Sequence, residues 1–289
     1  MYNIVDYKHL GGLTHEMSVE APQLAKKAQA GQFLIIRINE EGERVPLTIA
    51  DSDAEKGTIT IVFQAVGRST DELAQLRTGD QLADVVGPLG RASEIEKYGT
   101  VVIVGGGVGI APIYPIAKSL KAAGNHVISI IGAKNKDLLF WEDKMDSVSD
   151  ELHIATDDGS VGHKGFVTDI LEEVCSKGDV AAVWAVGPMI MMKNCARVTK
   201  PFGVKTFVSM NPVMIDGTGM CGGCRIQVGD DTKFACVDGP EFDGHEVDFD
   251  LAMKRSAYLK NLEAEGRQFY HDHQCNLGLE HDDRPAKGV

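Results

Sequence analysis

The stretch Thr100-Val101-Val102-Ile103-Val104-Gly105-Gly106-Gly107-Val108-Gly109-Ile110-Ala111-Pro112 joins an unbroken apolar run to a glycine-rich turn, and a segment with helical apolar spacing follows as far as Leu120. Strands buried on both faces of a parallel sheet have such apolar runs. Glycine lets the backbone approach a pyrophosphate, and the N-terminus of the next helix offers free N–H groups. The stretch predicts a strand, a phosphate-binding turn and a helix. Glycine turns of this kind also serve strand–helix packing without a ligand.

The segments after this unit alternate between strand-like and helix-like patterns. Apolar strands are expected at 126–131, 151–155 and 181–186, with a helix at 167–175. Alternating strands and helices predict a doubly wound parallel sheet. Residues 99–208 are therefore expected to form a nucleotide-binding α/β domain.

The first 98 residues have a different character. β-Branched runs at 33–38 and 58–63 are flanked by Gly or Asp, and one helix is expected at 69–76 behind a Ser/Thr/Asp cap. Short strands punctuated by Gly and Pro predict a small antiparallel barrel over residues 1–98. The fold class expected for the chain is thus β plus α/β.

A second informative stretch is Met214-Ile215-Asp216-Gly217-Thr218-Gly219-Met220-Cys221-Gly222-Gly223-Cys224-Arg225, which Cys236 follows. A plant-type [2Fe–2S] cluster is held by Cys-x4-Cys-x2-Cys and a distant fourth Cys. Here Cys221, Cys224 and Cys236 take the last three positions, and Asp216 takes the first. A hard carboxylate oxygen binds Fe(III) well and would shift the cluster potential. The same residues would also suit a zinc site, or a Cys-x-x-Cys redox pair beside a buried Cys236.

Residues 209–248 are expected to form this small cluster lobe, and a charged, helical tail is expected at 249–289. The tail would either dock a partner or cover its own domain, because apolar residues lie between its charges. Cys175 and Cys195 lie in helix-like segments and are expected to be buried thiols, while Cys275 is assigned no role.

Composition limits the partners of the chain. The net charge of −13 argues against nucleic acid or an anionic membrane as a partner. The N-terminus has no charged region followed by an apolar run, and no run of about 18 apolar residues occurs. Six cysteines without an export signal are expected to be ligands and buried thiols rather than disulfides. We therefore expect a cytoplasmic protein.

The glycine turn departs from the common dinucleotide fingerprint. It carries Pro112 in place of the third glycine, and Gly132-Ala133-Lys134 puts no acidic residue after the next strand. It resembles the G-x-G-x-(G/A)-x-x-P loop of the ferredoxin–NADP reductase superfamily, as do Thr156–Ser160 and Val186–Met192. The resemblance implies an NAD(H) site at Gly105, Gly107, Gly109, Pro112, Asp157, Gly187, Pro188 and Met189.

That superfamily places an FAD barrel before the nicotinamide domain, with an R-x-(Y/F)-(S/T) motif against the flavin. Arg44-Val45-Pro46-Leu47-Thr48 matches in part, since Leu47 replaces the aromatic residue and Arg44 is one position out of register. Gly87-Pro88-Leu89-Gly90 matches the motif that ends the barrel. The resemblance implies an FAD site at Pro46, Leu47, Thr48, Val66, Gly67, Ser69, Thr70, Gly87 and Pro88.

Barrel, nicotinamide domain and cluster lobe follow one another in a branch that includes the electron-transfer subunit of NAD-linked dihydroorotate dehydrogenase, whose cluster loop has four Cys. Because of Asp216, the sequence looks more like the small (alpha) subunit family of NADH-dependent reduced ferredoxin:NADP oxidoreductase, also called sulfide dehydrogenase beta subunit. The resemblance covers residues 1–250 and implies that Asp216, Cys221, Cys224 and Cys236 are the cluster ligands.

The family implies a heterodimer with a larger FAD subunit, which is related to the glutamate synthase small subunit, carries [4Fe–4S] clusters and meets ferredoxin. This chain would exchange hydride with NAD(H) at FAD and pass single electrons through its cluster, with electron bifurcation on the partner's flavin. No catalytic side chain is expected, because the cofactors carry the chemistry. NAD is expected rather than NADP, since no group of Arg or Ser follows Lys134.

Three other functions remain open on the sequence. The chain could be the electron-transfer subunit of dihydroorotate dehydrogenase, or a stand-alone sulfide, polysulfide or ferredoxin reductase. It could also be a zinc-bearing binding module whose glycine loop is only structural.

Overall fold

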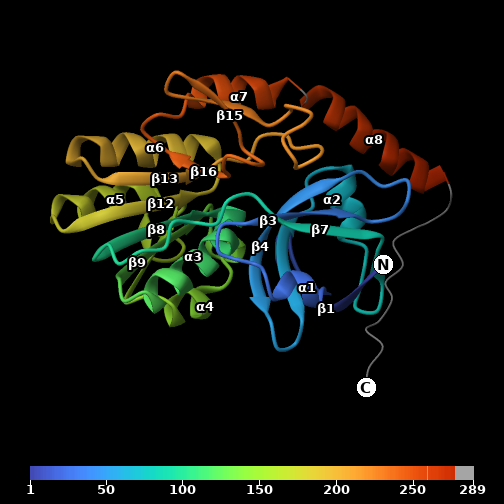
Figure 1. Cartoon of the computed structure of the whole chain (residues 1–289), viewed down its shortest axis with the longest axis horizontal. Helices are drawn as coiled ribbons and strands as arrows, with labels where there is room; N and C mark the ends of the chain where they lie inside the picture. Colours follow the sequence, from blue (N-terminus) through green and yellow to red (C-terminus); the bar gives the residue numbers. More distant parts are fainter. Residues whose placement is uncertain (259, 277–289) are drawn as a thin grey trace.

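The computed structural model describes residues 1–258 and 260–276 of the 289-residue chain. Two seven-stranded sheets, one from the N-terminal part and one from the middle of the chain, lie side by side (Figure 1). A third, smaller lobe from the C-terminal part lies across both of them. This is the β plus α/β architecture with a C-terminal lobe that the sequence predicts.

The N-terminal sheet is antiparallel and curls into a nearly closed barrel, with the strand order β6-β1-β2-β5-β4-β3-β7. Its strands are β1 (Tyr2–Gly11), β2 (Thr14–Glu20), β3 (Phe33–Arg37), β4 (Val45–Asp53), β5 (Thr58–Gln64), β6 (Gln81–Leu82) and β7 (Asp84–Leu89). Two short helices, α1 (Pro22–Ala25) and α2 (Arg68–Leu73), join them. Met17, Ile36 and Ile61 are fully buried in the barrel core.

The second sheet has the strand order β11-β10-β9-β8-β12-β13-β16 and is parallel except for β16. Its strands are β8 (Thr100–Gly106), β9 (His126–Ala133), β10 (Glu151–Thr156), β11 (His163–Lys164), β12 (Val180–Val186), β13 (Lys205–Ser209) and β16 (Glu241–Asp243). The strand order reverses at β8, because β9 and β10 lie on one side of it and β12 and β13 on the other. Ligands of such sheets bind outside the carboxyl ends of the strands at this reversal.

Helices cover both faces of the second sheet. They are α3 (Ile110–Ala122), α4 (Glu142–Ser147), α5 (Val167–Ser176) and α6 (Met189–Thr199), with the 3-10 turns η1 (Gly107–Gly109), η2 (Lys136–Leu138) and η3 (Lys200–Phe202). Side chains alternate between the faces along β8, as strand geometry requires. Val101 and Ile103 share a buried cluster with α3, whereas Val102 and Val104 share one with α5 and α6. Burial on both faces explains the unbroken apolar run.

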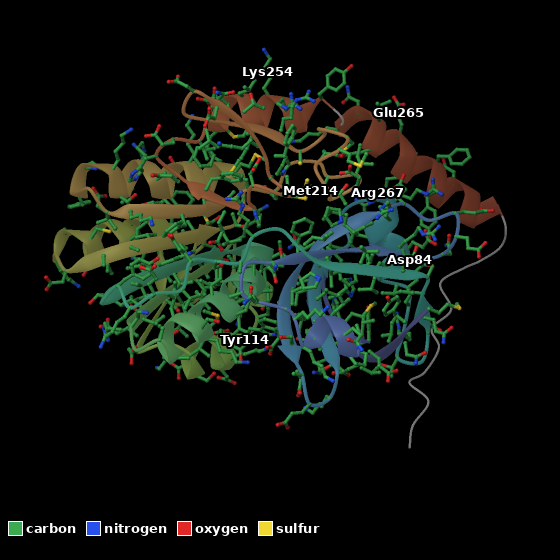
Figure 2. All side chains as sticks on the ribbon, in the orientation of Figure 1. Asp84, Tyr114, Met214, Lys254, Glu265 and Arg267 are labelled. Atoms are coloured by element: carbon green, nitrogen blue, oxygen red, sulfur yellow. The ribbon has the colours of Figure 1, made fainter. Side chains whose placement is uncertain are left out.

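The C-terminal lobe is fastened at two places. Its hairpin, β14 (Arg225–Val228) and β15 (Asp231–Phe234), leads to β16, which pairs antiparallel with β13 and sets Phe242 opposite Val208. Helix α7 (Phe249–Ala257) packs on α6, and α8 (Lys260–Asn276) returns to the barrel. There Arg267, which points from α8 toward the barrel in Figure 2, places its Nε 2.6 Å from Asp71 Oδ2 of α2.

The elements that the sequence predicts are present. The runs at 33–38 and 58–63 form β3 and β5, the helix at 69–76 forms α2, and the helix at 167–175 forms α5. The three strands expected after the glycine turn are β9, β10 and β12. The tail predicted at 249–289 contains α7 and α8, and its residues 277–289 lie outside the described part of the structure. In the second sheet, β11, β13 and β16 had no counterpart in the prediction.

The thiols expected to be buried, Cys175 and Cys195, are 4% and 0% exposed. The side chain of Cys275 lies outside the described part of the structure. Within residues 1–258 and 260–276, no helix is long and apolar enough to cross a bilayer.

The first residue of β16 carries an acid that points into the protein. Glu241 Oε1 accepts a hydrogen bond from Ser93 Oγ at 2.6 Å, and Oε2 accepts one from Trp184 Nε1 at 3.3 Å. The residue keeps some exposure because β16 lies at the sheet edge, yet its carboxyl group lies deep. Burial raises the pKa of Glu241 to about 7, against the effect of both hydrogen bonds.

We expect Glu241→Gln to stabilise the protein at pH 8 and to have a much smaller effect at pH 5. A carboxyl group whose pKa is about 7 when folded and 4.5 when unfolded contributes most stability below pH 4.5, and this is lost as pH rises through 7. The loss in the wild type is roughly 3 kcal/mol at pH 8. Urea unfolding from pH 5 to 8 measures it, with Glu246→Gln, an exposed carboxyl group of the same lobe, as control. A difference that does not change with pH would contradict the assignment.

Candidate functional site

The predicted cluster loop is organised around one carboxylate. Asp216 accepts hydrogen bonds from the backbone N–H groups of Thr218, Met220 and Cys221 at 3.0 to 3.1 Å. The Thr218 amide is the largest of the causes that lower the pKa of Asp216 to about 2. The side chain is therefore ionised at neutral pH and carries the charge that a metal ligand needs.

The four predicted ligands form two pairs. Cys221 Sγ lies 3.3 Å from Asp216 Oδ1, and Cys224 Sγ lies 3.3 Å from Cys236 Sγ. Two ligands on one tetrahedral metal are roughly 3.5 Å apart, so each pair has the spacing for one iron. In the described ranges, no three His, Cys, Asp or Glu side chains gather into a group for a single metal ion. The two pairs fit the two irons of a [2Fe–2S] cluster better than a four-ligand zinc site.

The loop is buried on one side and open on the other. Cys224 and Cys236 are each 1% exposed, whereas Cys221 is exposed. Burial raises the pKa of Cys236 to about 12, so this thiol would lose its proton only to a bound metal. Exposed apolar side chains surround the open side, and we call them the cluster rim. The cluster rim consists of Val213, Ile215, Met220 and Val237.

The predicted NAD(H) residues lie at the carboxyl ends of the strands, where the strand order reverses. Gly105, the residue before the end of β8, pairs with Val186 of β12, and η1 leads directly into the N-terminus of α3. Gly187, Pro188 and Met189 follow β12, so the structure brings the two predicted segments together. The positive end of the α3 helix dipole lies at this place, which suits a pyrophosphate.

The glycines of this turn have two different physical roles. A Cβ on Gly105 would lie 2.6 Å from Ile113 Cδ1, and one on Gly109 would overlap the carbonyl of Val186, so the fold itself requires both. Gly107 has a φ of +56° and open space around its Cβ position. Gly107 is therefore the position in this turn where a ligand could approach the backbone closely.

Acidic residues border the place where a nucleotide ribose would lie. Asp157 and Asp158 follow β10, and their backbone N–H groups donate to Ala133 O and Lys134 O, each at 3.2 Å. These acids lie beside the end of β9, where the 2′-phosphate of NADP would need cations. At a nucleotide bound as the sequence predicts, their charge would favour NAD over NADP.

The predicted FAD residues come from three segments of the barrel: β4, the start of α2, and Gly87 and Pro88 of β7. Pro46, Leu47 and Thr48 lie in β4, while Val66 and Gly67 precede α2. Ser69 Oγ donates a hydrogen bond to Glu43, which joins the start of α2 to the loop before β4. Thr70 Oγ1 accepts from the N–H groups of Val66 and Gly67 at 3.1 and 3.0 Å. A Cβ on Gly87 would lie 3.1 Å from Leu34 Cβ, so Gly87 also serves close strand packing.

Sequence reasoning missed the contribution of α8 to this region. Arg267 Nη2 donates to Ala65 O at 3.4 Å, and Tyr270 lies under the Arg68 guanidinium, 5.9 Å from it. The helix thus covers the segment predicted to hold the FAD phosphates. The alternation of apolar and charged residues in the tail indicated a packed helix but not which surface it would cover.

The barrel lies between the other two sites. The turn η1 packs against β5, next to the β4 residues of the flavin motif. On the other side, a Cβ on Gly217 of the cluster loop would lie 2.5 Å from Ile35 Cδ1 and 3.0 Å from Leu89 Cδ1. Phe33 of β3 pairs with both Thr48 and Leu89. Thr48 of the flavin motif and Leu89, which the cluster loop contacts, are thus two strand spacings apart, roughly 10 Å.

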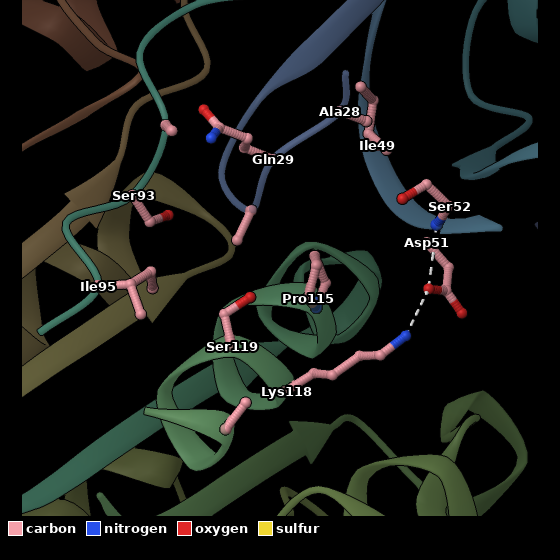
Figure 3. Close-up of a pocket in the computed structure, with 13 residues that line it drawn as sticks. Ala28, Gln29, Ile49, Asp51, Ser52, Ser93, Ile95, Pro115, Lys118 and Ser119 are labelled. Carbon is pink, nitrogen blue, oxygen red and sulfur yellow. Dashed lines mark hydrogen bonds and ion pairs between the residues drawn. The ribbon is translucent and has the colours of Figure 1, made fainter. Parts of the chain in front are cut away.

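A pocket of about 620 Å³ lies between the barrel and α3 (Figure 3). None of the predicted FAD, NAD(H) or cluster residues lines it, because it faces the later turns of α3, at Lys118 and Ser119. Lys118 Nζ lies 3.4 Å from Asp51 Oδ1, and Lys144 Nζ lies 2.9 Å from Asp51 Oδ2. These ion pairs hold the two domains together, and we assign the pocket to their boundary.

Comparisons with known proteins agree with this geometry. Residues 211–248 match the iron-sulfur cluster binding domain of dihydroorotate dehydrogenase B, and residues 103–197 match the oxidoreductase NAD-binding domain. The chain is 51% identical over 245 residues to the electron transfer subunit homolog of dihydroorotate dehydrogenase B (NAD(+)) from Thermotoga maritima, which covers 85% of this chain and 86% of that protein. The chain belongs to this family of electron-transfer subunits.

Other family members and solved structures support the assignment. The electron transfer subunit of dihydroorotate dehydrogenase B from Fusobacterium nucleatum is 32% identical over 247 residues, covering 82% of this chain and 93% of that protein. A chain of NADH-dependent reduced ferredoxin-NADP oxidoreductase, solved in a study of flavin-based electron bifurcation, is 47% identical, with a TM-score of 0.87, and covers 92% of this chain and 97% of that one. Phthalate dioxygenase reductase shares the fold at 17% identity, with a TM-score of 0.56, over 78% of this chain and 85% of that one.

Membership of the family settles the cofactors and the class of chemistry. The chain is a subunit of a flavin-dependent NAD(P)H oxidoreductase and uses FAD, a [2Fe–2S] cluster and NAD(H). The zinc-bearing binding module that the sequence left open is therefore excluded.

We expect Gly107→Ala to weaken NADH binding at least tenfold, because the new methyl group and its strained backbone would occupy the bare side of the turn. A left-handed alanine costs roughly 1–2 kcal/mol. Gly203→Ala is the matched control, since Gly203 has a φ of +65° and equally open surroundings but lies at the end of η3. NADH titration of flavin reduction and thermal unfolding measure both variants. Equal stability losses with an unchanged KM for NADH in Gly107→Ala would contradict this role.

We expect Asp216→Cys to retain two irons and to change the potential and visible spectrum of the cluster, because a thiolate donates more charge than a carboxylate. Asp216→Ala should lose or destabilise the cluster. Iron analysis and redox titration measure both, with Asp230→Ala, an exposed aspartate of the same lobe, as control. If Asp216→Ala leaves spectrum and potential unchanged, Asp216 is not a ligand.

Proposed function

We propose that this chain exchanges hydride with NAD(H) at its FAD and passes single electrons through its [2Fe–2S] cluster to a larger flavin and iron–sulfur subunit. The complex would be an NADH-dependent reduced ferredoxin:NADP oxidoreductase, an electron-bifurcating transhydrogenase. One observation supports this electron path: the barrel contacts the nucleotide turn through β5 and the cluster loop through Ile35 and Leu89. Electrons that enter at the nicotinamide would thus pass first to the flavin and then to the cluster.

The residues of this chain would orient the cofactors rather than react. When bound, FAD supplies the conversion of two-electron hydride chemistry into one-electron transfer. Pro46 to Thr48 of β4 would line the flavin ring, and the segment from Val66 to Thr70 would hold its phosphates under α8. Gly105 to Gly109 would hold the NAD(H) pyrophosphate against the α3 N-terminus, with Gly187 to Met189 beside the nicotinamide. No side-chain acid or base is needed.

The exposed apolar side chains of the cluster rim are evidence for a protein partner that receives the electrons. Ile215 is 56% exposed and Met220 is 89% exposed, next to the exposed ligand Cys221. Apolar side chains grouped around a redox site are typical of a protein–protein contact. We assign this surface to the larger subunit, related to the glutamate synthase small subunit, whose [4Fe–4S] clusters would pass electrons to ferredoxin and whose flavin would bifurcate them.

A second candidate is favoured by the names of the relatives. The Thermotoga maritima protein and the Fusobacterium nucleatum protein are named as electron-transfer subunits of dihydroorotate dehydrogenase B or a homolog of it. The carboxylate at the first ligand position argues for the ferredoxin:NADP oxidoreductase. Reduction of the chain by dihydroorotate in the presence of its native partner would favour the second candidate.

The test of the proposed function is an anaerobic visible spectrum of the purified chain before and after NADH, with iron and flavin quantified. We expect about two irons and one FAD per chain, and bleaching at flavin and cluster wavelengths on adding NADH. NADPH should act more slowly, because Asp157 and Asp158 repel a 2′-phosphate. A colourless, zinc-containing protein would overturn the proposal, and equal rates with NADH and NADPH would overturn the cofactor preference.

We expect Met220→Glu to slow electron transfer to the partner at least tenfold and to leave reduction of the chain's own flavin by NADH unchanged. The new charge would lie in the middle of the cluster rim and would have to be desolvated in the complex. Phe202→Glu is the control, because Phe202 is an exposed apolar residue of η3, away from the rim. Stopped-flow reduction of the reconstituted complex measures both. Identical transfer rates in the two variants would place the partner elsewhere.

A further inference from the structure

Glu241 lies where the three parts of the chain meet. Its hydrogen-bond donor Ser93 belongs to the segment that leads from the barrel to the second sheet, and its other donor, Trp184, belongs to β12. A Cβ on Gly31 of the barrel would lie 2.9 Å from Glu241 Oε1. The carboxyl group is thus enclosed by the barrel side, the nucleotide sheet and its own lobe.

The same lobe fixes Glu241 relative to the cluster. Cys236 precedes Glu241 by five residues, a reach of at most about 17 Å for an extended chain. The intervening segment is tied down, because Arg91 N donates to Gly239 O at 2.7 Å and Arg91 Nε donates to Val237 O at 3.3 Å. A change of charge at Glu241 therefore acts on the cluster from a fixed position.

Both protonation states of Glu241 can be satisfied without rearrangement. The Ser93 hydroxyl can donate to a carboxylate or accept from a carboxylic acid, and the Trp184 N–H donates in either state. The pair therefore allows proton exchange while the junction stays closed. This distinguishes Glu241 from a buried acid that is locked in one state by an ion pair.

The charged groups facing Glu241 do not neutralise it. The charge of Glu94 helps to raise the pKa of Glu241, and Glu94 itself is paired with Lys205, Nζ to Oε2, at 2.8 Å. Burial and these acids raise the pKa of Tyr98 to about 12, so Tyr98 stays neutral through the physiological range. The ion pairs found in the described part of the chain include none with Glu241. Glu241 is thus a lone acid in a low-dielectric junction, and its protonation responds strongly to added negative charge.

We propose that Glu241 is proton-linked to the cluster: its affinity for a solvent proton rises when the cluster takes up an electron from the flavin, and it falls again when the cluster is reoxidised. No covalent bond other than the O–H bond of Glu241 forms or breaks. The added electron favours the neutral carboxyl group, and by reciprocity protonation favours the reduced cluster. The inference rests on the proposed function, because it requires the cluster to accept electrons through this chain.

The test is a redox titration of the cluster in the purified holoprotein from pH 5.5 to 9, followed by the electron paramagnetic resonance signal of the reduced cluster. The wild-type midpoint potential should fall as pH rises through about 7 and level off on either side. Glu241→Gln should remove this dependence, because an amide cannot titrate, and Glu246→Gln should keep it. Ser93→Ala should move it to higher pH, because it removes a hydrogen bond that favours the carboxylate.

The possible results of this titration separate failure of the inference from failure of the proposed function. A wild-type potential that is independent of pH would overturn the inference without any variant. A dependence that survives in Glu241→Gln would assign it to another group and would also overturn the inference. If Glu241→Gln does not fold, the upward shift in Ser93→Ala keeps the inference testable, and no shift would overturn it. Protein that contains no flavin or iron would overturn the proposed function instead.

Discussion

One hydrophobic core holds the barrel, the nucleotide sheet and the cluster lobe in fixed relation. Phe33 and Ile35 of β3, Val104 of β8, and the ligands Cys224 and Cys236 belong to the same buried cluster. Displacing the lobe would expose apolar surface at a cost of about 25 cal/mol for each Å². The electron path depends on this constraint, because the shared core fixes the separation between the flavin motif and the cluster loop, together with hydrogen bonds such as that from Arg91 N to Gly239 O.

The cluster loop combines two opposite environments. Cys224 and Cys236 are part of the core, whereas Asp216 and Cys221 face the open side. A carboxylate suits that side, because it stays ionised in water and its amide hydrogen bonds shape the loop before metal arrives. With the predicted ligands the iron pair would be asymmetric, because the ligand nearest the proposed partner surface would be a carboxylate rather than a thiolate. This asymmetry would let the chain tune the potential of the cluster where electrons leave it.

Elements with a strong local signal were predictable from sequence. The run from Thr100 to Val104 reports burial on both faces, so its place in the middle of a parallel sheet follows from composition. The spacing of Asp216, Cys221, Cys224 and Cys236 likewise predicted an iron–sulfur lobe, which the family match over residues 211–248 confirms, because ligand spacing is a local signal. The strand β16 was not predictable, because three residues carry no periodic signal and only pairing with β13 makes them a strand. Likewise, nothing in the spacing of Arg267 indicates that it would reach Asp71.

Short-range patterns of burial, backbone freedom and ligand spacing were enough to predict the β plus α/β fold class from the sequence and to propose the residues that would meet a nucleotide and a pair of irons. The sequence did not indicate that the cluster loop rests on Ile35 and Leu89, that the nucleotide turn rests on β5, or that Glu241 is enclosed by all three parts. These contacts join residues far apart in the chain, and burial against several partners at once is what selects them.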